Sequence, residues 1–300
     1  MRVLSMKFSR SIPLLFLTIL FSTNNGGCQK NPPTSPETDA KQAAAESPAE
    51  NTAEEKASST TTPEEMPIDP KLVVKPGEPM TAERFKTVKE NLKQLGLSLH
   101  NFHEEYSMFL PSPEDHPEYY DENGLLKVSW RVHLLPFLDQ KDLYNQFKLG
   151  EAWDSPHNAL LAKNMPETFR SPDTPANATK TRFRIFQGKP EKDSEGKMRM
   201  TSLFPLGTPA RIRDTLDGTS NTIMVVEVGP DKAVEWTKPG GLSLTQPKEE
   251  LGATASTVAV LKGDGSVSLI KQDLDKIQWK ELVGPQDMTR IDWDAIEVQP

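Results

Sequence analysis

Two histidines stand close enough on one predicted helix to share a ligand. His100 and His103 are three residues apart, and Glu104 follows the second directly. Side chains at this spacing lie on the same face of a helix, where two neutral imidazoles can bind a metal ion. Such a site needs a third ligand from elsewhere in the chain. Polar residues beside an apolar stripe are more often solvated or bonded to a neighbouring loop, so both interpretations stay open.

A second group of polar side chains lies between Arg211 and Asn221. Three of these residues carry side-chain oxygens that could bind a hard cation such as calcium: Asp214, Asp217 and Asn221. Asp and Asn also stabilise loops by hydrogen bonding to the backbone, which requires no ion. We favour the loop interpretation and keep calcium as the alternative. The sequence predicts no other cofactor.

Motifs that supply an activated nucleophile or a phosphate-binding loop are absent from the sequence. There is no Gly-x-Ser-x-Gly, no His-Glu-x-x-His and no glycine-rich phosphate loop. The single cysteine, Cys28, lies near the N-terminus, in a segment typical of export. The sequence therefore predicts a protein that is not an enzyme, and a hydrolase of envelope polymers is the last of our hypotheses.

Residues 1–27 have the features of an export signal. A positively charged start precedes the apolar run Ile12 to Phe21, which is too short to cross about 30 Å of hydrocarbon as a helix. Cys28 directly follows Gly27, as in a bacterial lipobox, where the thiol carries diacylglycerol after cleavage. Because Asn25 departs from the usual aliphatic residue, ordinary cleavage and an uncleaved anchor remain alternatives.

Residues 28–79 have the composition of a disordered tether. Pro, Ala, Ser, Thr and Glu dominate, and large apolar side chains are few, so little surface is available to offset the entropy of ordering. As a random coil, this segment would hold the domain at residues 80–300 roughly 40 Å from the membrane. The net charge of −8 argues against a nucleic-acid partner.

One amphipathic helix is predicted at the start of the domain. Its apolar residues recur at steps of three and four: Phe85, Val88, Leu92, Leu95, Leu99, Phe102 and Tyr106. Thr81 suits the N-cap, and Pro111 and Pro113 prevent the helix from continuing. We expect the stripe to pack on the protein's own sheet. An intermolecular coiled coil is the alternative.

The rest of the domain reads as short helical turns followed by strands. Helical turns are predicted within residues 129–147 and from Asp154, and strands at residues 181–187, 222–228, 254–262 and 266–270. The last two strands flank Gly263-Asp264-Gly265 and predict a hairpin. Asp273 is expected to cap a final helix that Gly284 ends. The fold class is therefore α+β, with a long N-terminal amphipathic helix packed on an antiparallel β-sheet.

Six blocks of sequence carry a family resemblance. They are Asn91–His103, Ser129–Leu138, Glu151–Asn158, Asp217–Glu227, Val234–Pro239 and Gly263–Val267. Together they resemble a large, largely uncharacterised bacterial family that is abundant in planctomycetes and joins a prepilin-type helix to a His-x9-Asp-Gly signature. The resemblance implies a pseudopilin-like fold with no established activity. It also supports the calcium hypothesis, since pseudopilins of secretion systems bind calcium in loops of their sheets.

The chain departs from this family at both ends of the pattern. It lacks the Gly-Phe-Thr-Leu-x-Glu processing site and the apolar half of the pilin helix, so it cannot polymerise as a pilin does. Thr254 stands ten residues before Asp264, where the family has its signature histidine. We therefore expect this chain to lack the role that the histidine has in the family.

Two functions follow from these observations. The first is a non-enzymatic, membrane-tethered lipoprotein of the cell envelope that faces the periplasm or surface and uses a pilin-like domain for surface display or contacts with an unidentified envelope protein. The second is a ligand-binding envelope module for a solute, a glycan or calcium. The tryptophans Trp130, Trp153, Trp236 and Trp279 would belong to the core or line a pocket. An apolar concavity at Trp153 or Trp236 would favour the second function.

Overall fold

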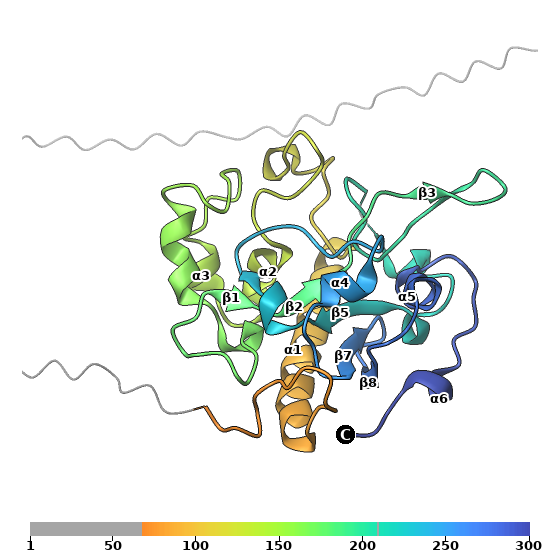
Figure 1. Cartoon of the computed structure of the whole chain (residues 1–300). Helices are drawn as coiled ribbons and strands as arrows, with labels where there is room; N and C mark the ends of the chain where they lie inside the picture. The colour runs from red at the N-terminus through yellow and green to blue at the C-terminus, as the bar shows by residue number, and fades with distance from the viewer. Residues whose placement is uncertain (1–67, 209) are drawn as a thin grey trace, which may run out of the picture. The chain divides into compact units, whose positions relative to one another are not determined.

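A computed structural model describes residues 68–208 and 210–300 (Figure 1). The predicted signal at residues 1–27, Cys28 and the tether up to residue 67 lie outside the described residues. Among the helices of residues 68–208 and 210–300, none has both the length and the apolar character needed to cross a bilayer.

The helices of the described part are one long helix and several short ones. The α-helices are α1 (Ala82–Tyr106), α2 (Trp130–His133), α3 (Lys141–Tyr144), α4 (Pro247–Leu251), α5 (Lys276–Val283) and α6 (Trp293–Ile296). The 3-10 turns are η1 (Pro117–Tyr119), η2 (Leu135–Phe137), η3 (Asn158–Asn164), η4 (Glu167–Phe169), η5 (Ile212–Asp214), η6 (Thr219–Asn221) and η7 (Pro230–Lys232). The turns predicted in residues 129–147 are confirmed, whereas the turn expected from Asp154 begins at Asn158.

In the part of the chain that the structure describes, the strands pair in three antiparallel sheets. The main sheet has the order β2-β5-β7-β8, with β2 at Phe183–Ile185, β5 at Ile223–Glu227, β7 at Thr257–Lys262 and β8 at Val267–Lys271. Two small sheets pair β1 (Lys180–Thr181) with β6 (Val234–Glu235), and β3 (Glu191–Lys192) with β4 (Met198–Arg199). The α+β prediction is confirmed, and so is the hairpin of β7 and β8. The β3–β4 hairpin was not predicted.

The predicted stripe of α1 forms the contact with the main sheet. Its members from Phe85 to Phe102 are buried, and Thr81 caps the helix by accepting the N–H of Arg84. A Cβ atom at Gly96 would lie 2.9 Å from Cδ1 of Leu261 on β7, so a larger residue at this position would have to displace the Leu261 side chain. The packing of a long helix on the antiparallel sheet agrees with the prediction.

α1 ends earlier than the prolines would require. Ser107 adopts the left-handed conformation with φ 58, and its N–H donates to the carbonyl of His103. This cap closes the last turn at Tyr106, five residues before Pro111.

The main sheet is buried on both faces. Ala259 and Leu261 of β7 face the core that contains α1, whereas Val258 and Val260 face a second core with Trp279 of α5. This alternation follows from the two-residue period of a strand. The segment from 116 to 172 contributes to the first of these cores, through residues such as Trp130 and Phe169. It is therefore part of the same hydrophobic core as α1.

The cap of α5 differs from the prediction. Asp275, not Asp273, accepts the N–H groups of Ile277 and Gln278, and the side chain of Gln278 accepts the N–H of Asp275. This reciprocal capping box requires a residue three positions after the cap that can accept in return, and Gln278 provides it only for Asp275. Gly284 ends the helix as predicted.

Residues 70–79 pack on the domain, although their composition placed them in the tether. The buried Val74 donates its N–H to the carboxylate of Asp173 at 3.1 Å. Gly77 donates to the carbonyl of Thr254, and Ser256 donates to the carbonyl of Glu78. Backbone pairing, which composition does not reveal, holds this segment.

Candidate functional site

The two histidines of α1 lie near each other but have different surroundings. Nε2 of His103 accepts the N–H of Ile212 at 3.1 Å, which joins α1 to the start of η5. Burial, with the neighbouring His100 adding to it, lowers the pKa of His103. Nε2 of His100 is buried, has no partner among the described residues and lies beside Gly265. The contact to a neighbouring loop is the alternative to metal binding that the sequence left open.

The predicted calcium residues are occupied by hydrogen bonds within the protein. Oδ2 of Asp214 accepts the N–H of Arg211 at 2.9 Å, and the carboxylate of Asp217 accepts the N–H groups of Asp287 and Met288. The side chain of Asn221 donates to the carbonyl of Asp217 and accepts the indole N–H of Trp293. These contacts match the interpretation favoured from the sequence, in which the side chains stabilise the loop.

Grouped metal ligands are not found in the described part of the chain. Within residues 68–208 and 210–300, no three His, Cys, Asp or Glu side chains are placed to hold one ion.

The loop brings Asp217 next to Asp287. Burial raises the pKa of Asp287 to about 6, and the adjacent Asp217 carboxylate adds to the shift. Asp287 is therefore protonated more readily than an ordinary aspartate, which disfavours a cation at this position.

The tryptophans belong mainly to the core. Trp130, Trp236 and Trp279 are almost fully buried, and the ring of Trp236 stacks on Phe169 at 5.8 Å between centroids. Trp153 is half-buried, with Nζ of Lys238 5.7 Å from its ring centre. The apolar concavity that would have favoured a ligand pocket at Trp236 is filled by protein.

A large hollow lies between the β3–β4 hairpin and α5. It has a volume of about 690 Å³. The hairpin forms one wall, Lys276 and Lys280 of α5 the other, and residues 187–189 and 243–245 complete it. In Figure 1 the hairpin extends away from the main sheet. We call it the hairpin hollow.

Charges of both signs line the hairpin hollow. Nζ of Lys280 lies 3.6 Å from the carboxylate of Glu191, which links α5 to β3 across the hollow. Arg199 donates to Asp193 at 2.8 Å within the hairpin. Two large apolar residues, Met200 and Leu244, are among its walls. The surface is therefore polar and suited to a polar partner.

Gln286 connects the hairpin to the loop that was predicted to bind calcium. Its Oε1 accepts the N–H of Met200 at 3.0 Å, and its Nε2 donates to the carbonyl of Asp214 at 3.1 Å. The hollow, the hairpin and the acidic loop are thus joined through one side chain.

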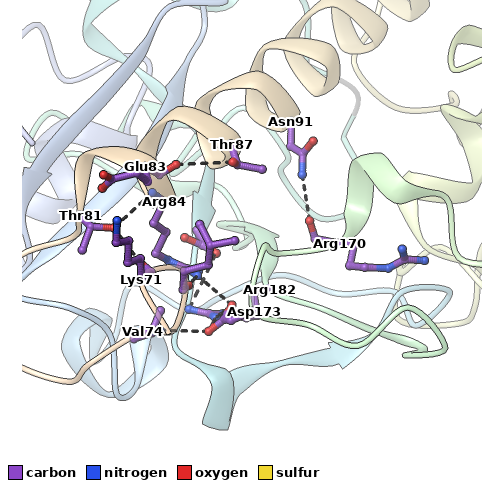
Figure 2. A network of polar contacts seen from close by, with 12 residues as sticks. Lys71, Val74, Thr81, Glu83, Arg84, Thr87, Asn91, Arg170, Asp173 and Arg182 are labelled. Atoms are coloured by element: carbon purple, nitrogen blue, oxygen red, sulfur yellow. Dashed lines mark hydrogen bonds and ion pairs between the residues drawn. The ribbon is translucent and has the colours of Figure 1, made fainter. Parts of the chain in front are cut away.

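A buried ionic network lies at the other side of the sheet, where α1 begins (Figure 2). Arg84 donates to Asp173 at 2.9 Å and to Glu227 at 2.5 Å, and Arg182 donates to both oxygens of Asp173 at 2.7 and 2.9 Å. Arg84 also donates to the carbonyl of Leu72. The network joins the segment before α1, the helix, β5 and the loop at Asp173, with two positive and two negative groups.

The network holds Asp173 in its charged form. Burial alone would raise the pKa of Asp173, but the guanidinium groups of Arg182 and Arg84 outweigh it, with the N–H of Val74 adding to them. The pKa of Asp173 is therefore below its ordinary value.

Sequence reasoning did not identify this network or the hairpin hollow. Asp173 and Glu227 are 89 and 143 residues from Arg84, so no local pattern joins them. The sequence did contain one signal of a buried charge. Arg84 lies four residues before Val88 and therefore on the buried stripe of α1. Thr254, at the family's histidine position, is buried and donates to the carbonyl of Ala255.

Comparison with known proteins identifies one family. The family described as “Protein of unknown function (DUF1559)” matches residues 86–250, which is more than half of the chain. No curated protein and no solved structure matches. The matched residues include most of α1, Asp173, Glu227 and the β3–β4 hairpin, whereas α5 lies beyond them.

Proposed function

We propose that this chain, which belongs to the DUF1559 family of proteins of unknown function, is a non-enzymatic, exported lipoprotein whose folded domain makes contacts with other envelope proteins. The lipid is carried by Cys28 and anchors the protein in the membrane of the cell envelope, facing the periplasm or the surface. The domain is pseudopilin-like, as the packing of α1 on the main sheet and the resemblance of the six sequence blocks support.

The hairpin hollow is the observation that carries this proposal. Small-molecule sites are mostly lined by apolar and aromatic side chains, but the walls here are polar and open. Charges of both signs on two separate elements give an interface its specificity, because a partner must present the complementary pattern. A protein segment that enters between the hairpin and α5 meets these charges on both sides.

Site-specific crosslinking in cells tests the proposal. A photoreactive residue at Lys192, which lines the hollow, should give a defined protein adduct, while one at Lys86 on the exposed side of α1 should not. Changing Lys189 and Lys276 together to Glu should abolish the adduct from position 192. Absence of an adduct, or equal adducts at both positions, would overturn the proposal.

The lipid anchor has its own test. Cys28→Ala should prevent lipidation and release the protein from the membrane fraction. An unchanged processed mass and unchanged fractionation would show that Cys28 carries no lipid.

A second candidate function is the binding of a solute or glycan. The volume of the hairpin hollow supports it, since ligand sites commonly have about 300–1,000 Å³. A ligand at a hundred times its Kd adds about 2.7 kcal/mol to stability and raises the melting temperature by a few degrees. Melting the full chain with a panel of solutes and glycans separates the two candidates: a shift without a protein adduct favours solute binding.

A further inference from the structure

One contact between the end of α1 and η5 depends on the protonation state of a histidine. Nε2 of His103 accepts the backbone N–H of Ile212 at 3.1 Å. An imidazole nitrogen accepts a hydrogen bond only when it carries no proton, so this contact requires His103 to be neutral. Protonation of Nε2 places two N–H groups against each other and breaks the contact.

The surroundings of His103 oppose its protonation. Burial lowers the pKa of His103, and the neighbouring His100 lowers it further. The ring of His103 lies against Phe109, with 4.9 Å between ring centroids. The other titratable side chains of the elements that meet here are Glu104, Glu105 and Tyr106 on α1, Arg211, Arg213 and Asp214 at η5, and Asp264 in the turn beside His100. No carboxylate is among the causes of the pKa shift, so protonation of His103 gains no counter-charge.

A short series of hydrogen bonds links η5 to the wall of the hairpin hollow. The N–H of Arg211 donates to Oδ2 of Asp214, which closes the turn of η5. The carbonyl of Asp214 accepts from Nε2 of Gln286 at 3.1 Å, and Oε1 of Gln286 accepts the N–H of Met200 at 3.0 Å. Gln286 and Met200 both line the hairpin hollow. The contact at Ile212 and the hollow are therefore the two ends of one connected path.

A second attachment of the same segment does not titrate. The N–H of Phe109, just after α1, donates to the carbonyl of Ala210 at 3.0 Å. Loss of the His103 contact therefore releases η5 locally and leaves the segment attached two residues earlier.

We infer that His103 is a pH-sensitive latch for the hairpin hollow. Neutral His103 holds η5 against α1, and Asp214 then keeps Gln286 and Met200 in the arrangement described above. Protonated His103 releases η5, and this part of the wall shifts. Because the closed latch favours neutral His103, it loses stability as the pH falls below about 6.5, the ordinary pKa of histidine. The effect on partner binding rests on the function proposed above, whereas the release of η5 does not.

An NMR titration of the full chain between pH 8 and pH 4.5 tests the latch. Asp287 also lines the hollow and titrates at about 6, so the chain carries Asp287→Asn. We expect the backbone amide signals of Ile212 and Met200 to move with one midpoint below about 6.5, shared with the ring signal of His103.

Two histidine variants separate the latch from a general effect of acid. His103→Gln keeps a side-chain acceptor that does not titrate, so the movements of the Ile212 and Met200 signals with this midpoint should disappear. His157→Gln is the matched control, because the imidazole of His157 contacts the carbonyl of Gln146 and takes no part in the path. Different midpoints for the two amides, or persistence of the movements in His103→Gln, would overturn the latch.

Crosslinking from position 192 at pH 7.5 and pH 5.5 tests the effect on the partner. In the Asp287→Asn chain the adduct should fall about two- to tenfold at the lower pH, the effect of losing one hydrogen bond. His103→Gln should abolish this fall. An adduct yield that does not respond to pH would overturn the link to binding. Absence of any adduct would count against the proposed function alone, since the NMR titration decides the latch independently.

Discussion

The indole Nε1 of Trp293 donates a hydrogen bond of 2.9 Å to the side-chain Oδ1 of Asn221. The two residues are 72 positions apart, and Nδ2 of the same Asn221 donates to the carbonyl of Asp217 in its own loop. Lys262 lies over the Trp293 ring at 4.1 Å. One amide therefore shapes the loop and fastens the C-terminal segment to it.

Asn221→Ala should destabilise the domain by about 1–2 kcal/mol. It removes both side-chain hydrogen bonds and leaves the Trp293 indole N–H without its acceptor. Urea unfolding monitored by tryptophan fluorescence measures the change. Asn123→Ala is the matched control, because Asn123 is exposed and its side chain makes no hydrogen bond within the described residues. Equal midpoints for the two variants would contradict the role of Asn221.

Removal of calcium should leave the stability of the domain unchanged. The carboxylate of Asp217 accepts two backbone N–H groups and Asp214 accepts one, so a cation would have to displace hydrogen bonds that already exist. The measurement is a pair of thermal melts, one with calcium and one with a chelator. A melting temperature that rises with calcium and does so less in Asp217→Asn would instead establish the calcium site.

The periodicity of the sequence was sufficient to predict α1 and its contact with the sheet. The stripe from Phe85 to Phe102 is a local pattern, and Thr81 is a local cap. The end of α1 was not predictable in this way, because the left-handed conformation of Ser107 depends on how the following loop packs. The β3–β4 hairpin has exposed strands of two residues, so it offers no alternation of apolar and polar residues.

The residues that define the candidate sites come together through the fold. Arg84 meets Glu227 because α1 and β5 are packed near each other, and Lys280 meets Glu191 because α5 lies beside the hairpin. Each pair joins elements that are distant in the chain. Hydrophobic patterns identify the elements, but they do not specify which charged residues become neighbours.

Asp287→Asn should stabilise the domain at neutral pH and have little effect in acid. The pKa of Asp287 is raised to about 6 in the folded state, above its ordinary value. The stabilisation from its protonated form is complete below the ordinary pKa and is lost as the pH rises through about 6. Above that pH the wild-type protein holds two adjacent charged carboxylates, Asp217 and Asp287, whereas the variant holds one.

Thermal melts between pH 4 and pH 8 check this expectation. The melting temperature of Asp287→Asn should exceed that of the wild type at pH 8, and the two should converge at pH 4. Asp294→Asn serves as the control, since Asp294 is exposed and forms no ion pair within 4.0 Å among the residues that the structure describes. A constant difference across the pH range would refute the raised pKa of Asp287.

Asp173→Asn should destabilise the domain by about 3 kcal/mol at pH 7, because it leaves Arg84 and Arg182 buried without one of their carboxylates. The pKa of Asp173 is below its ordinary value, so its stabilisation is present above that value and is lost as the pH falls through the folded-state pKa. Urea unfolding at pH 7 should therefore separate the variant from the wild type, and the difference should shrink below about pH 4. Asp193→Asn removes a partner of Arg199 in a more exposed ion pair and should cost less. If both variants lost the same stability at pH 7, the buried network would contribute no more than a surface ion pair.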